Sequence, residues 1–295
     1  MRYLRAAAVA GLVCVSAQAA LVDDVRLLMR DRGLPAAESA VRAAQAQNGG
    51  TPEVAAAISW LARGALAAKQ WTKADSYAAE TRTVALRALG MRRLDSDPWL
   101  PTAVGAAIEV HAGVLASQGR RAEAVAYLQD QLKTWGATSL RERIQKNINL
   151  LGLEGKPAPP LAGVNLTGLK GRPVLLFFWA HWCPDCKAEA PIVAAAEKRF
   201  PSLAVVGPTR LYGYAAGGDP APPDAEKKYI EEIRKKYYAS LATMPAPINS
   251  ANFETYGAST TPTMVLLDRA GNVRMYHPGA VPQDELFARI QALVQ

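Results

Sequence analysis

Apolar residues in the first half of the chain recur every three or four positions, which is the period of an α-helix. From residue 20 to about 152 the sequence is rich in alanine and shows little of the alternation that is typical of strands. Two stretches have the form of paired helices: residues 58–66 pair with 71–78, and residues 108–115 pair with 124–128. The pattern therefore predicts an all-α region built from helical hairpins.

The second helical pair resembles a tetratricopeptide repeat, because the small residues Ala112 and Ala124 stand where two helices must approach closely. Ala74 and Ala124 occupy equivalent places in the two pairs, but their spacing exceeds the roughly 34 residues of that repeat. A repeat array and a plain helical bundle both explain the periodicity, so both interpretations stay open.

The pattern changes after a stretch rich in glycine and proline, Gly-Leu-Glu-Gly-Lys-Pro-Ala-Pro-Pro at residues 152–160. Such a stretch is typical of a domain boundary, and we place the boundary between residues 152 and 153. Strand and helix patterns then alternate to the end of the chain. The expected strands are 174–179, 203–206, 263–267 and 273–277, and the expected helices are 184–199, 225–238 and 283–294. This order predicts an α/β domain of three layers, a mixed sheet with helices on both faces.

The N-terminus has the pattern of a secretory signal peptide over residues 1–19. Arg2 and Arg5 precede a short apolar run, and Ala-Gln-Ala at 17–19 offers a cleavage site. We expect cleavage after Ala19 and export, with the periplasm as the compartment. A lipid anchor on Cys14 is less favoured, because Val13 is larger than the residue that usually precedes such a cysteine. No later segment is expected to span a membrane.

Cysteine and charge content narrow the classes of function. The chain has three cysteines, and cleavage would leave only Cys183 and Cys186. A pair so close in sequence closes almost no loop, so it adds little stability and indicates chemistry instead. The net charge of +8 falls to +6 without residues 1–19, and the densest basic stretch, residues 227–236, is interleaved with glutamates. That mixture is typical of a solvated helix face and argues against nucleic-acid binding.

Cys183 falls where the predicted helix should begin. Pro184 suits the first helical position, and a thiolate on Cys183 would accept hydrogen bonds from the free amides of the first turn. Cys186 follows one turn later on the same face, within reach of a disulfide bond. A zinc site is the competing interpretation, but it would need two further ligands, and no other cysteine remains after cleavage. We expect no metal and no cofactor.

Asp185 opposes the thiolate. A carboxylate roughly 7 Å away, at an effective dielectric near 60, disfavours the anion by about 0.8 kcal/mol. The helix dipole favours it by a similar amount, about 0.3–1 kcal/mol. A less stabilised thiolate makes the disulfide the better-held form, so we expect a reducing couple.

The segment Phe-Trp-Ala-His-Trp-Cys-Pro-Asp-Cys-Lys at 178–187 resembles the thioredoxin superfamily, with Pro191 and the pair Thr261-Pro262 at matching positions. The lead-in at 156–160 and Glu189 are closer to its TlpA/ResA branch of exported thiol–disulfide oxidoreductases. The resemblance covers roughly residues 153–295.

The resemblance also implies roles for single residues. It implies attack by an exposed Cys183 and resolution by a more buried Cys186. It implies a cis bond before Pro262, which brings the backbone of Thr261 beside the disulfide to pair with a substrate strand. For Glu189 two interpretations stay open: a proton acceptor for the thiol of Cys186, or a solvated helix residue.

Other residues are expected to contact the substrate around the disulfide. Trp182, Pro184 and Asp185 border the cysteines, and His181 is expected to be a solvated neighbour. Residues 207–247 form a long insertion relative to plain thioredoxin. Its first loop should leave the sheet at the same edge as Cys183, where Arg210 and Tyr212, together with Tyr214, would shape a groove. The alternative is a surface elaboration without a role.

The function expected from these observations is reduction of disulfides in exported proteins. The resemblance implies that a membrane thiol transporter supplies the electrons, and the helical region would then serve as a docking surface. Two alternatives remain. The first is net oxidation or isomerisation of disulfides. The second is a helical scaffold or chaperone with a secondary redox site.

Overall fold

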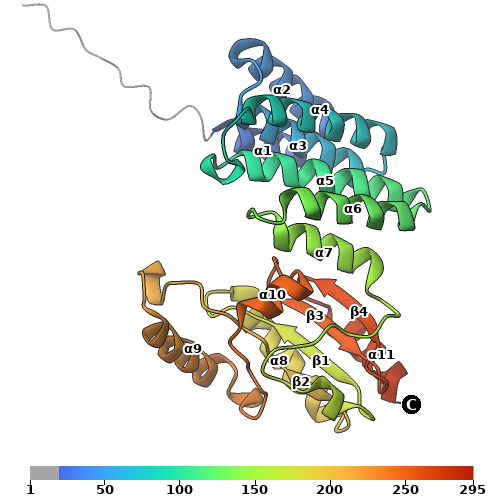
Figure 1. Cartoon of the computed structure of the whole chain (residues 1–295), viewed down its shortest axis with the longest axis vertical. Coiled ribbons are helices and arrows are strands. Elements are labelled where there is room, and N and C mark those ends of the chain that lie inside the picture. Colours follow the sequence, from blue (N-terminus) through green and yellow to red (C-terminus); the bar gives the residue numbers. More distant parts are fainter. Residues whose placement is uncertain (1–19, 295) are drawn as a thin grey trace, which may run out of the picture. The chain divides into compact units, whose positions relative to one another are not determined.

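The structure is a computed structural model, and it describes residues 20–294 (Figure 1). The signal peptide predicted for residues 1–19 lies outside the described residues. Backbone contacts divide the chain into two compact units, one up to Val114 and one from Leu115 onward.

The first unit is built from helices, as predicted. They are α1 (Ala20–Arg32), α2 (Leu34–Asn48), α3 (Pro52–Ala67), α4 (Trp71–Leu89) and α5 (Leu100–Ser117), whose last turn runs past the end of the unit. Thr51 caps α3, because its hydroxyl accepts a hydrogen bond from the N–H of Val54 at 3.3 Å and Pro52 fills the first helical position. Small buried residues such as Ala62 in α3 and Ala74 in α4 let these two helices pack as the predicted hairpin.

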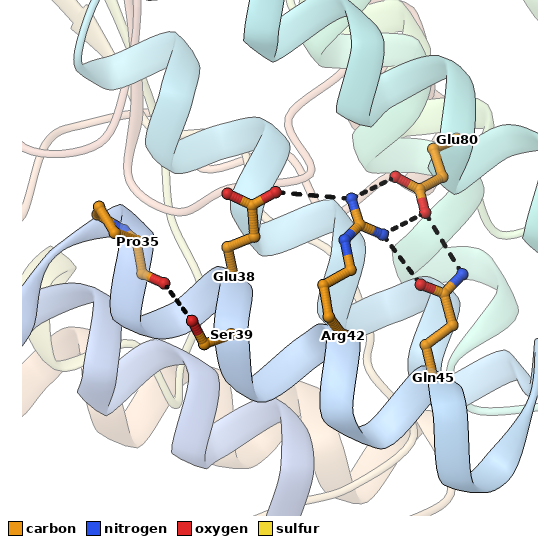
Figure 2. Close-up of polar contacts among 6 residues, drawn as sticks. All are labelled: Pro35, Glu38, Ser39, Arg42, Gln45 and Glu80. Carbon is orange, nitrogen blue, oxygen red and sulfur yellow. Dashed lines mark hydrogen bonds and ion pairs between the residues drawn. The ribbon is translucent and has the colours of Figure 1, made fainter.

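A half-buried polar cluster joins α2 to α4 (Figure 2). The guanidinium of Arg42 makes two hydrogen bonds to the carboxylate of Glu80, one of them 2.9 Å long, and a third to Gln45. Glu38 lies 3.7 Å from the same guanidinium. A fork of this kind fixes both side chains and so fixes the position of α2 against α4. The tetratricopeptide interpretation, made for the helical pairs at residues 58–78 and 108–128, stays a prediction.

Helix α5 departs from the expectation that no segment after residue 19 could span a membrane. Among residues 20–294 it is the one helix that is long and apolar enough by length and composition. However, most of its length is buried, and the core helix of a globular protein meets the same criterion. The observation is therefore weak evidence for a membrane span.

The second unit contains two helices and then alternating strands and helices. The elements are α6 (Arg121–Trp135), α7 (Arg141–Gly152), β1 (Val174–Phe178), α8 (Pro184–Arg199), β2 (Ala204–Val206), α9 (Pro223–Tyr237), α10 (Ser250–Tyr256), β3 (Thr263–Leu267), β4 (Val273–Pro278) and α11 (Gln283–Val294). The predicted strands and helices are present to within two residues, while α10 was not predicted. The second compact unit begins at Leu115, before α6. The domain boundary predicted between residues 152 and 153 concerns which segment can fold alone, and it stays a prediction.

The sheet has the strand order β2-β1-β3-β4 and is mixed (Figure 1). Strand β1 pairs in parallel with β2 and antiparallel with β3, and β3 pairs antiparallel with β4. Leu175 and Phe177 face a core shared with α8, α9 and α11, whereas Leu176 and Phe178 face a second core shared with α10. Because both faces are buried, β1 is a continuous apolar run. The three-layer α/β fold is confirmed.

The parallel pairing of β1 and β2 brings the loops that follow them together. The N–H of Trp179, just after β1, donates to the carbonyl oxygen of Pro208 at 3.1 Å. The hydroxyl of Thr209 donates to the carbonyl oxygen of Trp179 at 2.8 Å. The insertion therefore begins beside the loop that carries the cysteines, as the sequence predicted.

Candidate active site

Cys183 stands at the N-cap of α8, between the end of β1 and the first helical turn. Its backbone is extended, and Pro184 takes the first helical position. Its Sγ accepts a hydrogen bond from the N–H of Cys186 at 3.0 Å. Free amides and the positive end of the helix dipole therefore meet at this sulfur, where they stabilise a thiolate in the reduced protein.

Cys183 and Cys186 are joined by a disulfide bond, with their Cα atoms 5.3 Å apart. The bond closes a loop of only one helical turn, so it removes little entropy from the unfolded chain. Pro191 lies inside the same helix. The structure thus places a reversible redox pair at the start of a helix, in the oxidised state.

The segment before β3 lies beside the disulfide. The peptide bond between Thr261 and Pro262 is cis. The carbonyl oxygen of Thr261 lies 3.4 Å from the Sγ of Cys183. The structure therefore brings the Thr261-Pro262 pair beside Cys183, which lies 78 positions earlier in the sequence. The pairing of this segment with a substrate strand stays a prediction.

The expected exposure of Cys183 is wrong for this disulfide form. Cys183 is 1% exposed, and Cys186 is fully buried. The bond to Cys186 holds the sulfur of Cys183 against the helix start, and the backbone of Thr261 lies over it. The neighbouring Trp182 is 45% exposed, so its indole supplies the accessible apolar surface next to the disulfide.

Glu189 is buried in α8, which contradicts the solvated alternative. It is 4% exposed, and its carboxylate accepts a hydrogen bond from the N–H of Val281 at 3.4 Å. Burial raises the pKa of Glu189, an effect opposed by that hydrogen bond and by His277. Glu189 lies three residues after Cys186, on the same face of the helix. Its role as a proton acceptor stays a prediction.

Two predicted residues of the insertion, Arg210 and Tyr212, contact each other: the Arg210 guanidinium lies 5.1 Å from the centroid of the Tyr212 ring. Tyr212 lies near the disulfide, with its ring centroid 5.6 Å from that of Trp182. Arg210 also forms an ion pair with Glu142 of α7, and its guanidinium lies over the ring of Phe253 as well. A direct contact between Arg210 and a substrate stays a prediction, since its guanidinium already has a partner.

Pro184 and Asp185 are exposed at the start of α8. Both therefore border the disulfide on its open side, next to Trp182. Their contact with a substrate stays a prediction.

His181 is not the solvated neighbour that the sequence suggested. Its side chain is fully buried, and its Nε2 lies 3.0 Å from Oε1 of Glu226, which is also fully buried. Sequence reasoning missed Glu226 because it lies in a highly charged helix. One signal could have found it: Glu226 lies four residues before Ile230 and seven before Ile233, so it belongs to the buried face of α9.

Metal binding is a separate question for this site. Within residues 20–294, no group of three or more histidine, cysteine or acidic side chains is arranged to hold a metal ion. The expected absence of a metal or cofactor stays a prediction.

The fold and the site define a thioredoxin-like domain whose cysteine pair starts a helix. The family described as thioredoxin-like domain matches residues 164–293. The thiol:disulfide interchange protein DsbE of Xylella fastidiosa is 31% identical over 142 residues, which are 44% of this chain and 64% of that protein. The chain thus spans less than two thirds of that relative.

Two further relatives match more of their own length. The soluble secreted antigen MPT53 of Mycobacterium tuberculosis is 40% identical over 144 residues, which are 46% of this chain and 73% of the antigen. The thioredoxin-like protein YneN of Bacillus subtilis is 27% identical over 146 residues, 46% of this chain and 78% of that protein. This chain belongs to the family of thioredoxin-like thiol:disulfide interchange proteins.

A solved structure of a secreted Mycobacterium tuberculosis disulfide oxidoreductase is also similar. It is 24% identical, covers 44% of this chain and 88% of its own, and aligns with a TM-score of 0.36. A score this low adds nothing to the assignment. The family relationship rests on the sequence relatives.

Proposed function

We propose that this chain is an exported thiol–disulfide oxidoreductase that reduces disulfide bonds in other exported proteins. The observation that carries the proposal is the position of the Cys183 sulfur. It lies 3.0 Å from the amide nitrogen of Cys186 at the start of a helix and 3.4 Å from the carbonyl oxygen of Thr261. The amide of Cys186 on one side of the sulfur stabilises a thiolate, and the backbone of Thr261 on the other side can pair with a substrate.

The reaction proceeds in two exchanges. The thiolate of Cys183 attacks one sulfur of the substrate disulfide, the substrate S–S bond breaks, and the other sulfur leaves as a thiolate. Cys186 then loses its proton to Glu189 and attacks the Sγ of Cys183, which releases the second substrate thiolate. Two electrons pass to the substrate, its two thiolates take up protons, and the protein ends with the Cys183–Cys186 disulfide.

The direction of net transfer follows from the charges around Cys183. Asp185 is exposed at the second helical position and opposes a thiolate on Cys183. A less stabilised thiolate lowers the reduction potential, which supports a reductase. The alternatives are net oxidation, in which the Cys183–Cys186 disulfide is the active form, and isomerisation, in which the Cys183 thiolate attacks a substrate disulfide and is released again without net electron transfer.

Export and partners are part of the same proposal. The related MPT53 antigen is described as secreted, and the predicted signal peptide at residues 1–19 agrees with export. An exported dithiol needs a source of electrons, for which we propose a membrane thiol transporter. The helices before residue 153 would then select the client protein by docking, and no cofactor beyond the disulfide is required.

Insulin reduction, together with a measured reduction potential, tests the proposal. The wild-type protein should reduce insulin, and Cys183→Ser should not. Equilibration with glutathione should give a potential nearer the about −270 mV of thioredoxin than the about −120 mV of a strong oxidant. A potential at the oxidising end would favour the oxidase. If wild type and Cys183→Ser do not differ in insulin reduction, the dithiol does not carry the activity, which would favour the alternative of a helical scaffold or chaperone.

A further inference from the structure

A buried hydrogen bond between two side chains joins the insertion to the loop that carries the cysteines. His181 precedes Trp182 in that loop, and its Nε2 lies 3.0 Å from Oε1 of Glu226 in the first turn of α9. Both side chains have no exposed surface. The reaction proposed above uses neither of them, so their burial calls for another explanation.

The carboxylate of Glu226 holds three segments at once. Besides His181, it accepts hydrogen bonds from the backbone N–H groups of Tyr212 and Gly213, the latter at 2.8 Å. The positive end of the α9 dipole also favours a negative charge at this position. One side chain thus connects the cysteine loop, the first loop of the insertion and the start of α9.

Aromatic rings complete the enclosure of His181. The rings of Tyr212, Tyr214 and Tyr229 lie edge-on to the imidazole, with centroids 5.3–5.4 Å away. Tyr212 in turn lies edge-on to Trp182, whose indole is exposed beside the disulfide. A change at Glu226 or His181 would therefore reach the surface next to the reacting sulfurs through Tyr212.

The protonation state of this pair follows from its surroundings. Burial lowers the pKa of His181; Glu226 opposes that effect, and the charge of Lys187 adds to it. Because a carboxylate can only accept, it is Nε2 that carries a hydrogen and donates it to Oε1 of Glu226. The N–H groups of His181, Tyr212 and Gly213 all donate to the two oxygens of the Glu226 carboxylate. In Glu226→Gln an NH₂ group replaces one of these oxygens and cannot accept, so the amide cannot serve all three donors.

We propose that His181 and Glu226 are positioning residues that fix the insertion against the cysteine loop and so shape the Trp182–Tyr212 surface on which a protein substrate docks. This inference rests on the proposed oxidoreductase function. The sulfur chemistry depends on the start of α8 and on Thr261, whereas the hydrogen bonds of the pair run to the insertion. The pair should therefore affect recognition of a folded protein disulfide more than exchange with a small disulfide.

The test compares two substrates, insulin and the small aromatic disulfide DTNB, with the full-length chain. In Glu226→Gln the KM for insulin should rise, and the ratio of kcat/KM for insulin to kcat/KM for DTNB should fall about five-fold, equivalent to roughly 1 kcal/mol. Glu232→Gln, at an exposed position of the same helix, is the matched control and should keep the wild-type ratio.

A second pair of variants covers the case in which Glu226→Gln does not fold. His181→Phe keeps an aromatic ring among the tyrosines but removes the N–H donor, and it should lower the ratio in the same way. His181→Gln keeps an N–H donor toward Glu226 and should recover most of the ratio.

Each outcome separates the two claims. An unchanged ratio in His181→Phe, with wild-type reduction of both substrates intact, would overturn the positioning role alone. Equal loss in His181→Phe and His181→Gln would also overturn it, because the donor would then not matter. A wild-type protein that reduces neither substrate would instead overturn the proposed function.

Discussion

Lys146 of α7 and Gly257, which ends α10, approach so closely that a Cβ on Gly257 would lie 2.2 Å from the backbone nitrogen of Lys146. Gly257 also has a φ of 60°, the left-handed conformation that favours glycine. Nearby, the side-chain amide of Asn149 donates to the carbonyl oxygen of Thr255 at 3.3 Å. Helix α7 is therefore packed directly against the thioredoxin-like part of its unit.

The first prediction concerns this close approach. Gly257→Ala should lower the free energy of unfolding by about 3 kcal/mol or more, because it adds a backbone clash to the strain of a positive φ. Gly155→Ala is the control, since Gly155 has a φ of 82° and a Cβ at that position would meet no other atom within 4 Å. It should cost only about 1–2 kcal/mol. If urea unfolding shows the same loss of free energy of unfolding for Gly257→Ala and Gly155→Ala, the close packing of α7 on α10 is contradicted.

The second prediction compares two fragments of the chain. A fragment that begins at Leu153 lacks α7, and with it Asn149 and the ion-pair partner of Arg210. We expect it to reduce insulin but to melt at a lower temperature than a fragment that begins at Gly119 and keeps α6 and α7. Thermal unfolding by circular dichroism checks this. Identical melting temperatures would show that the α/β segment is stable without α7.

The third prediction follows from the raised pKa of Glu189. A carboxyl group whose pKa is higher in the folded state stabilises the fold below its unfolded pKa, and this contribution is lost as the pH rises through the folded pKa. Glu189→Gln stays neutral at every pH. Its melting temperature relative to wild type should therefore rise between pH 4 and pH 8. If the difference in melting temperature between Glu189→Gln and wild type stays constant from pH 4 to pH 8, folding does not raise the pKa of Glu189.

The fourth prediction tests Glu189 as the proton acceptor. If its carboxylate takes the proton of Cys186, Glu189→Gln should slow the release of the mixed disulfide by about ten-fold or more. The wild-type rate should fall on the acid side as the carboxylate becomes protonated, and the variant should lose that dependence. Stopped-flow measurement of the second exchange checks this. Superimposable pH–rate profiles would leave Glu189 with a structural role.

Most of the α/β fold could be predicted from hydrophobic periodicity. Strand 263–267 and helix 283–294 were predicted with the bounds that the structure has, because apolar runs and amphipathic periods there are uninterrupted. Helix α10 was missed because it has only two turns, too few for a period to show. Its contact with α7 depends on Gly257, and no local pattern marks a glycine that a distant helix approaches.

Only those parts of the site that depend on neighbours in sequence could be predicted. Cys183 at a helix start followed from its own neighbours in sequence. The burial of His181 could not, because it depends on Glu226, a residue 45 positions further along the chain. The ion pair of Arg210 likewise depends on Glu142, from the region that the sequence assigned to another domain.

The most direct test of the proposed reaction is to trap the mixed disulfide. Because Cys183 is the proposed nucleophile, reduced Cys186→Ser mixed with a disulfide-bonded protein should accumulate a covalent complex, visible by intact-mass spectrometry under non-reducing conditions. Reduced Cys183→Ser should accumulate little or none. A complex that forms on Cys186 in Cys183→Ser, with none on Cys183 in the matched variant, would contradict the assignment of Cys183 as the nucleophile.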